Sequence, residues 1–102
     1  MAEIDLTVKN FDSEVLASPV PVMVDFWAAW CGPCRMLAPV IAEFAEEHDG
    51  EVKVCKVNVD EQPELAARYN VTSIPTVLIF KNGTLTNSVI GYRPKAQLET
   101  LI

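Results

Sequence analysis

The sequence has few cysteines, a single histidine and no long apolar segment. Its three cysteines are an odd number and too few for a fold held together by disulfides. The longest apolar stretch, residues 15–24, contains Ser18, Pro19 and Pro21, so it predicts no membrane span. No block of five like charges occurs, and 14 acidic residues outnumber 8 basic ones. A phosphate backbone would be repelled, which argues against nucleic-acid binding.

The length and the start of the chain narrow the class of protein further. A chain of 102 residues, half of them apolar and 22% charged, fits one folded domain over residues 1–102 with its own core. Residues 1–5 are acidic and lack the basic and then apolar layout of a secretory signal. We therefore expect a cytoplasmic protein that is a monomer.

Apolar residues follow strand-like and helix-like periods in alternation along the chain. They predict strands at residues 4–8, 22–26, 51–59, 76–80 and 87–90, and helices at 10–16, after Cys34 to 48–50, 61–69 and 94–102. Asn10 is expected to cap the first helix, and Asn82-Gly83 predicts a hairpin. The order β-α-β-α-β-α-β-β-α predicts an α/β fold, a central mixed five-stranded sheet flanked by four helices.

The second helix carries apolar residues at helical spacing from Met36 to Ala45 and is expected to end at Gly50. Pro39 lies inside this helix. Since proline removes a backbone hydrogen bond, we expect a kink one turn after Cys34.

The sequence Cys31-Gly32-Pro33-Cys34 lies between an apolar strand and a helix. Two cysteines three residues apart at the start of a helix face the same side, close enough for a disulfide. Free backbone N–H groups and the positive end of the helix dipole favour the thiolate of Cys31, which is the nucleophilic form. Cys34 is expected to be more buried and to act second, as the resolving thiol. Gly32 leaves room around the sulfur atoms, and Pro33 stiffens the loop.

A metal site is the first alternative for this cysteine pair. Zinc requires four ligands, and the remaining candidates, Cys55 and His48, are not at paired spacing. We therefore expect no metal. Cys55 lies among valines and is interpreted as an inert core residue, and His48 as a complement to the dipole at a helix end.

The segment from Val24 to Arg35 resembles the active-site segment of the thioredoxin family. The resemblance covers essentially the whole chain, and its other motifs are Val57-Asn58-Val59-Asp60, Ile74-Pro75-Thr76, Phe80-Lys81-Asn82-Gly83 and Gly91. It implies the thioredoxin fold and a protein-disulfide reductase whose redox-active disulfide is Cys31–Cys34, with no bound cofactor. Such an electron carrier maintains the cellular thiol redox state, donates electrons to reductive enzymes and disulfide-containing target proteins, and is itself reduced by a thioredoxin reductase.

Asp25 interrupts an apolar strand just before the cysteine motif. If buried, its carboxyl has a raised pKa, because desolvation disfavours the charged form. The resemblance implies that Asp25 takes the proton from Cys34 and that Lys56 pairs with it. A surface strand lysine is the alternative interpretation of Lys56.

The resemblance also implies a substrate-binding surface around the cysteines. The Ile74–Pro75 bond is expected to be cis and to face the disulfide, so that the backbone of Ile74 can pair with an extended substrate segment. Trp30, Val59 and Gly91 complete this surface together with Pro33. Trp27 is assigned to the core.

Two other functions remain open on the sequence. One is an oxidant or isomerase with the same fold, against which the Gly32-Pro33 dipeptide argues. The other is a binding module in which the cysteine pair is incidental. The chain departs from the family pattern at two places. The segment Tyr92-Arg93-Pro94 is bulkier than the residues often found there, which affects the range of partners. The segment Thr72-Ser73 lacks a basic–glycine pair found in some members, which affects the charge of the surface.

Overall fold

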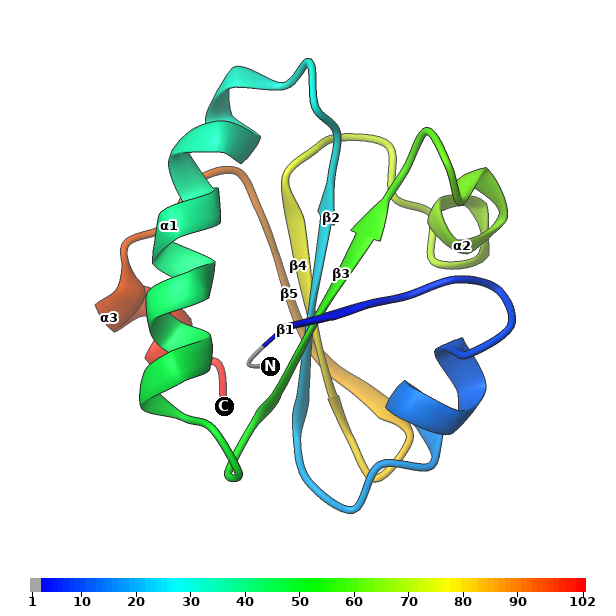
Figure 1. Ribbon diagram of the computed structural model, residues 1–102, viewed down its shortest axis with the longest axis vertical. Helices are drawn as coiled ribbons and strands as arrows, with labels where there is room; N and C mark the ends of the chain where they lie inside the picture. Colours follow the sequence, from blue (N-terminus) through cyan, green and yellow to red (C-terminus); the bar gives the residue numbers. More distant parts are fainter. Residues whose placement is uncertain (1–2) are drawn as a thin grey trace.

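The computed structural model describes residues 3–102, which form a mixed five-stranded sheet with helices on both faces (Figure 1). The strands are β1 (Glu3–Asp5), β2 (Val22–Trp27), β3 (Lys53–Asn58), β4 (Thr76–Lys81) and β5 (Thr84–Ile90), in the spatial order β1-β3-β2-β4-β5. The helices are η1 (Asp12–Leu16), α1 (Gly32–Glu47), α2 (Pro63–Arg68) and α3 (Lys95–Glu99), and η1 is a π-helix. The predicted α/β order is confirmed. Met1 and Ala2, which begin the expected domain, lie outside the described residues.

The central strand β2 explains why the sheet positions the cysteine motif. It runs parallel to β3 and antiparallel to β4, so it lies inside the sheet. Core residues pack on both of its faces, as its continuous apolar sequence predicts. One core lies between the sheet and η1 and α2, around Phe11, Phe26 and Phe80. The other lies beneath α1 and α3, around Ile41 and Phe44. The chain leaves β2 from this packed centre and turns directly into α1 (Figure 1).

The hairpin between β4 and β5 is confirmed at the predicted dipeptide. Asn82 and Gly83 have φ angles of 52° and 78°, the left-handed conformations that a two-residue hairpin turn requires. A Cβ on Gly83 would lie 2.9 Å from the carbonyl oxygen of Leu16, so the turn also packs tightly against the end of η1. Strand β5 begins at Thr84, earlier than expected, because the tight turn pairs Thr84 at once with Lys81.

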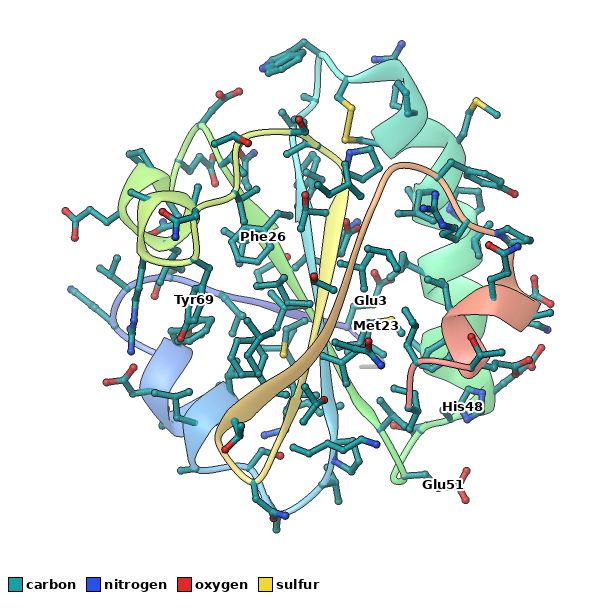
Figure 2. The ribbon with its side chains drawn as sticks, turned by 180° about the vertical axis from the view of Figure 1, so that it is seen from behind. Glu3, Met23, Phe26, His48, Glu51 and Tyr69 are labelled. Carbon is teal, nitrogen blue, oxygen red and sulfur yellow. A yellow bond between two sulfur atoms is a disulfide. The ribbon has the colours of Figure 1, made fainter. Side chains whose placement is uncertain are left out.

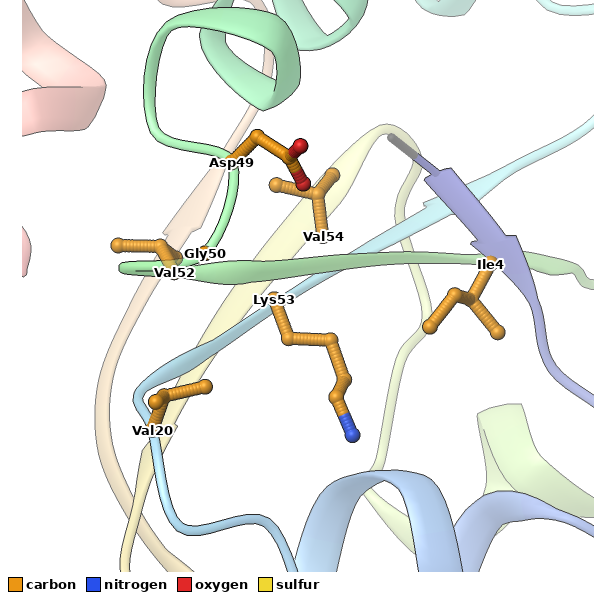
Figure 3. A pocket seen from close by; sticks show the side chains of 7 residues that line it. All are labelled: Ile4, Val20, Asp49, Gly50, Val52, Lys53 and Val54. Atoms are coloured by element: carbon orange, nitrogen blue, oxygen red, sulfur yellow. The ribbon is translucent and has the colours of Figure 1, made fainter. Parts of the chain in front are cut away.

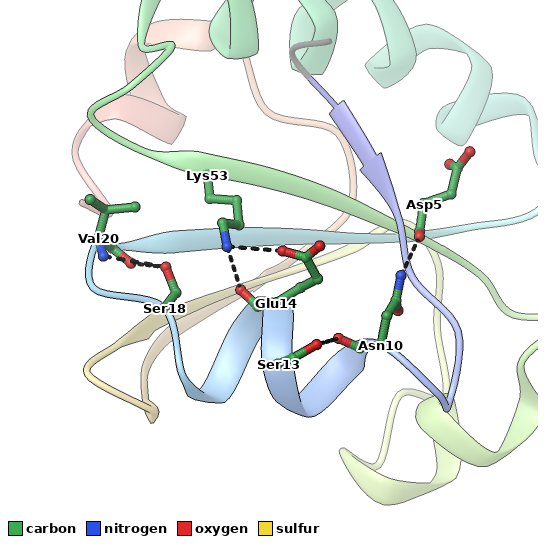
Figure 4. A network of polar contacts seen from close by, with 7 residues as sticks. All are labelled: Asp5, Asn10, Ser13, Glu14, Ser18, Val20 and Lys53. Carbon is green, nitrogen blue, oxygen red and sulfur yellow. Dashed lines mark hydrogen bonds and ion pairs between the residues drawn. The ribbon is translucent and has the colours of Figure 1, made fainter.

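The expected cap of the first helix is wrong. Phe11 is the N-cap residue of η1 and makes no side-chain cap. Asn10 instead accepts from the backbone N–H of Thr7 at 2.7 Å. It also donates to the carbonyl of Asp5 at 3.1 Å, as Figure 4 shows. These bonds fold the chain back after Asp5, which explains why β1 ends there and not at residue 8. Lys53 donates to the Glu14 carbonyl at 3.0 Å and anchors η1 to β3 (Figure 4).

Helix α1 begins at Gly32, inside the cysteine motif, and ends before His48. Gly50 follows with a φ of +85°, close to the predicted end. Met36, which begins the apolar pattern of this helix, is 63% exposed. The buried side of α1 is defined by Leu37, Ile41 and Phe44, and Met36 lies about 100° around the helix from Leu37. Among residues 3–102 there is no helix with the length and apolar character needed to cross a bilayer.

Candidate functional site

Cys31 and Cys34 form a disulfide at the N-terminal end of α1 (Figure 2). Their Cα atoms are 5.2 Å apart, which the first turn of the helix imposes. Cys31 is the N-cap residue, and its Sγ accepts a hydrogen bond from the backbone N–H of Cys34 at 3.2 Å. The same Sγ lies 3.8 Å from the carbonyl oxygen of Ile74. The predicted pair is therefore brought together, with Cys31 next to the loop that precedes β4.

The two cysteines are almost equally buried. Cys31 is 5% exposed and Cys34 is 4% exposed, so the expected difference in burial is not found. Both pack in a small cluster with Ala28, against which Val59 and Ile74 are packed. In the disulfide, exposure does not distinguish the two sulfur atoms, whereas the hydrogen bond from the Cys34 N–H to Cys31 Sγ does.

Asp25 lies at the centre of β2 and is 1% exposed. Its Oδ1 atom is buried without a hydrogen-bond partner among the described residues. Burial raises the pKa of Asp25 to about 7, the nearby Lys56 ammonium opposes the rise, and the Glu3 carboxylate adds to it. The sequence predicts the direction of this shift and its main cause. A carboxyl of this kind exchanges its proton near neutral pH.

Lys56 is the register partner of Asp25 on β3. Its Nζ atom pairs with Glu3 Oε1 at 3.8 Å and lies 5.0 Å from the centre of the Trp27 ring. Within residues 3–102, no ion pair joins Lys56 directly to Asp25, so Lys56 acts on that carboxyl through space. Sequence reasoning missed Glu3, because the sequence does not reveal that β1 lies beside β3.

A small cavity connects the region of Lys56 with the resolving cysteine. Its volume is about 90 Å³, and it is lined by Cys34 and Lys56 together with Trp27, Ala28, Ala29, Arg35 and Ala38. This volume is large enough for water, whose share of liquid volume is about 30 Å³. The cavity therefore places a space of this size directly beside Cys34.

The loop before β4 and the loop after β5 meet beside the disulfide. The Ile74–Pro75 peptide is cis, and the backbone N–H of Gly91 donates to the Pro75 carbonyl at 2.8 Å. Gly91 has a φ of +93°, a conformation that favours glycine. Val59 and Ile74 are half-buried against the cysteines. The backbone of this loop and the sulfur of Cys31 therefore share one surface.

Trp30 is the most exposed aromatic side chain near the motif, at 68%. Its Nε1 donates to Asp60 Oδ2 at 2.9 Å, so the ring is held beside the end of β3. Sequence reasoning gave Asp60 no role, although Asp60 is the last residue of the motif Val57-Asn58-Val59-Asp60. Trp27 is half-buried, and its Nε1 is buried without a partner in the described part of the chain.

Two other candidates lie apart from the cysteine pair. Cys55 is fully buried, and burial raises the pKa of its thiol to about 12, in agreement with an inert core residue. His48 stacks on Phe44 at the far end of α1 and contacts Glu99 at 3.0 Å. Glu47, His48 and Glu99 bring possible ligand atoms within 4.8 Å of one another there, but Lys95 already pairs with Glu47.

A pocket of about 200 Å³ lies at the end of the sheet opposite the disulfide (Figure 3). It is lined by Ile4, Val20, Asp49, Gly50, Val52, Lys53 and Val54. None of these residues is a predicted site residue. The predicted site residues therefore lie away from this pocket, around the first turn of α1 at the other end of the sheet.

Comparison with known proteins finds a match to the family model described as Thioredoxin over residues 2–102. The chain is 60% identical over 94 residues to "Thioredoxin M5, chloroplastic" of Oryza sativa subsp. japonica, covering 92% of this chain and 55% of the rice protein. It is 53% identical over 97 residues to "Thioredoxin 1" of Nostoc sp., covering 95% and 91% of the two chains. With "Thioredoxin" of Alicyclobacillus acidocaldarius subsp. acidocaldarius it is 53% identical over 98 residues, covering 96% and 92%.

The length covered differs between these relatives. The chain spans about half the length of the rice protein and about nine-tenths of the two bacterial proteins. The sheet order, the disulfide at the start of α1 and the match over residues 2–102 agree with one another. The protein thus belongs to the thioredoxin family, and Cys31–Cys34 is its redox-active disulfide.

Proposed function

We propose that the protein is a protein-disulfide reductase that works by reversible dithiol–disulfide exchange. The observation that carries this proposal is the disulfide at the N-terminus of α1, with Cys31 Sγ accepting from the Cys34 N–H and facing the loop at Ile74. A helix N-terminus stabilises negative charge, so the reduced protein holds a thiolate where a partner can reach it.

In the first step, the Cys31 thiolate attacks one sulfur of a target disulfide. A new S–S bond joins Cys31 to the target, the target's own S–S bond breaks, and its second sulfur leaves as a thiolate that takes a proton. In the second step, Cys34 attacks the sulfur of Cys31. The mixed disulfide breaks, and the target leaves as a dithiol. The two electrons that reduce the target come from Cys31 and Cys34, which end as a disulfide.

Asp25 serves as the proton acceptor for Cys34 in the second step. Its pKa of about 7 matches the operating pH, which is where general-base catalysis is most efficient. The cavity that Cys34 and Lys56 line offers room for water beside the Cys34 thiol, and Lys56 is the register partner of Asp25. Lys56 tunes the charge of Asp25, and Gly32 and Pro33 keep the turn between the sulfur atoms tight.

The target docks as an extended segment across the loop before β4. The backbone groups of Ile74, oriented by the cis bond to Pro75, pair with that segment in the manner of an added strand. Because Gly91 has no side chain, the backbone of the target segment can come close to it. Val59 and the exposed ring of Trp30 supply apolar contact. Target proteins that present a disulfide in an accessible extended segment fit this surface.

The proposed electron donor is a thioredoxin reductase. Residues 1–102 act in this scheme as one thioredoxin domain, a monomer in the cytoplasm that sustains cellular redox homeostasis. The word "chloroplastic" in the name of the rice relative makes a plastid the other location to test. Assays with a purified flavoenzyme that uses NADPH and with a ferredoxin-linked reductase distinguish the two kinds of electron donor.

The experiment that tests the function measures turnover and redox potential together. The protein is mixed with a disulfide-containing protein, one of the two reductases and its electron source, and the appearance of target thiols is followed. Catalytic turnover at a reducing potential supports the proposal. A strongly oxidising potential would instead identify an oxidant or isomerase. Thiol production that persists with alanine at both Cys31 and Cys34 would identify a binding module.

A further inference from the structure

We propose that Glu3 is a positioning residue, which draws the Lys56 ammonium away from Asp25 and thereby tunes Asp25 as a proton acceptor. This inference rests on the proposed function, in which Asp25 accepts the proton of Cys34. It assigns a role to a side chain on the edge strand β1, far from the cysteine motif in the sequence.

The strand register places the charged groups together. Strands β1, β3 and β2 are parallel, and Asp5, Lys56 and Asp25 lie in one row across them. Glu3 lies two residues before Asp5, two rows away, so its side chain points to the same face. Its neighbours in that row, Val54 and Met23, belong to the core beneath α1. Figure 2 shows Glu3 and Met23 on this side of the sheet.

The position of the Lys56 ammonium shows which carboxylate it pairs with. Lys56 could reach toward the neighbouring strand on either side, yet its Nζ pairs with Glu3 Oε1 at 3.8 Å. The side chains of Lys56 and Glu3 are only 18% and 27% exposed, so water screens the pair incompletely. Glu3 Oε1 is itself buried without a hydrogen-bond partner in the described chain, which leaves Lys56 as its compensating charge.

The charges around Asp25 come from three elements. Lys56 on β3 lowers the pKa of Asp25, and Glu3 on β1 raises it, after the larger effect of burial. Asp5 on β1 is exposed. On α1, Arg35 lines the same cavity as Lys56, but its Nη1 donates to the Ala29 carbonyl at 3.0 Å. On β4, the register partner of Asp25 is the uncharged Val77.

Removing the Glu3 charge releases Lys56 toward Asp25, the buried carboxyl that is its register partner on β2. The carboxylate form of Asp25 is then better stabilised and becomes a weaker base. Glu3 therefore keeps Asp25 poised near neutral pH by occupying Lys56 and by adding its own negative charge nearby.

The test follows the Asp25 carboxyl directly, by NMR titration of the oxidised full chain. Glu3→Gln is expected to lower the titration midpoint of Asp25 by about half a pH unit, since one nearby charge is removed. Asp5→Asn removes the same charge from the same strand at an exposed position and is the matched control, for which no shift is expected. Glu3→Asp retains the charge and should restore part of the midpoint. An Asp25 midpoint that is the same in Glu3→Gln as in the unaltered protein would overturn the inference.

A second comparison separates the effect of Lys56 from direct repulsion. In a Lys56→Met background, Glu3→Gln should move the midpoint of Asp25 less than it does when Lys56 is present. An equal shift in both backgrounds would overturn the role of Lys56 in the inference.

The kinetic readout is the pH profile of target release from the mixed disulfide. In Glu3→Gln this profile should move to lower pH by the same amount as the NMR midpoint. If the pH profile does not follow the Asp25 midpoint in any of these proteins, the proton-accepting role of Asp25 is overturned. Any catalytic consequence of Glu3 is then overturned as well. An unmoved midpoint overturns the Glu3 inference alone.

Discussion

The Sγ atom of Cys31 accepts a hydrogen bond from the backbone N–H of Cys34 at 3.2 Å. That N–H belongs to the first turn of α1, where backbone donors lack helical partners. The bond therefore favours negative charge on Cys31, while Cys34 lies within the helix. This asymmetry supports the proposed attacking role of Cys31 and resolving role of Cys34, even though the two side chains are almost equally buried.

Cys34→Ser should trap a covalent complex with a target protein. The variant keeps the Cys34 backbone N–H, and hence the stabilised Cys31 thiolate, but lacks the thiol that breaks the mixed disulfide. Mass spectrometry should detect a 1:1 covalent adduct that a small dithiol cleaves by reducing the mixed disulfide. The matched variant Cys31→Ser leaves only the Cys34 thiol, which lies within the helix and not at its N-cap, and should form at least about tenfold less adduct, since the thiolate is the reactive form. Equal trapping by both variants would contradict the assigned order.

The raised pKa of Asp25 makes the stability of the oxidised protein depend on pH. The folded state holds this proton up to about pH 7, whereas the unfolded chain releases it near the ordinary carboxyl pKa of 3.8. The stabilising effect of the proton is therefore complete below the unfolded value and is lost as pH rises to about 7.

Denaturation of the unaltered protein and of Asp25→Asn, measured across this range, checks that linkage. The free energy of unfolding of the unaltered protein should fall relative to the variant by about 1.4 kcal/mol per pH unit. The total difference should approach about 4 kcal/mol. A constant difference between pH 4 and pH 7 would show that Asp25 titrates as it does in water.

Local sequence patterns predict much of this site because they report on burial and turn geometry. The unbroken apolar run around Asp25 predicts a strand covered on both faces, and that burial is what shifts the carboxyl. Asn82-Gly83 predicts the hairpin because both residues tolerate positive φ. The cis bond before Pro75 is implied by family resemblance, since proline alone leaves trans favoured.

Features that depend on which strands are neighbours are not visible in the sequence. Glu3 becomes important only because β1 pairs with β3 and brings it to Lys56. Asn10 has the right residue type for a cap, but the chain reversal after Asp5 uses its side chain instead. Met36 matches the apolar pattern of α1 but lies one position before the buried Leu37, where a helix already turns toward solvent.

Gly91→Ala should weaken target binding more than folding. Both Gly91 and Gly50 have positive φ, at 93° and 85°, so alanine costs a similar backbone strain of about 1 kcal/mol at either position. A Cβ at Gly91 would lie 3.5 Å from Nη1 of Arg93, at a residue whose backbone N–H bonds to the Pro75 carbonyl, whereas at Gly50 it would meet nothing within 4 Å. We expect kcat/KM for target reduction to fall about tenfold in Gly91→Ala, equivalent to about 1.4 kcal/mol. Gly50→Ala should leave it unchanged, and an equal loss in both would attribute the effect to strain.

Cys55 should resist alkylation in the reduced, folded protein while Cys31 reacts. A thiol with a pKa of about 12 is ionised to only about one part in ten thousand at about pH 8, and the fully buried side chain excludes the reagent as well. Mass spectrometry after brief treatment with iodoacetamide should therefore find Cys31 labelled and Cys55 labelled only in denaturant. Cys55→Ala should reduce targets at the unaltered rate, because neither exchange step uses this sulfur. Rapid labelling of Cys55 in the folded state would mean that β3 opens to solvent, and it would make Cys55 a third participant in the redox chemistry.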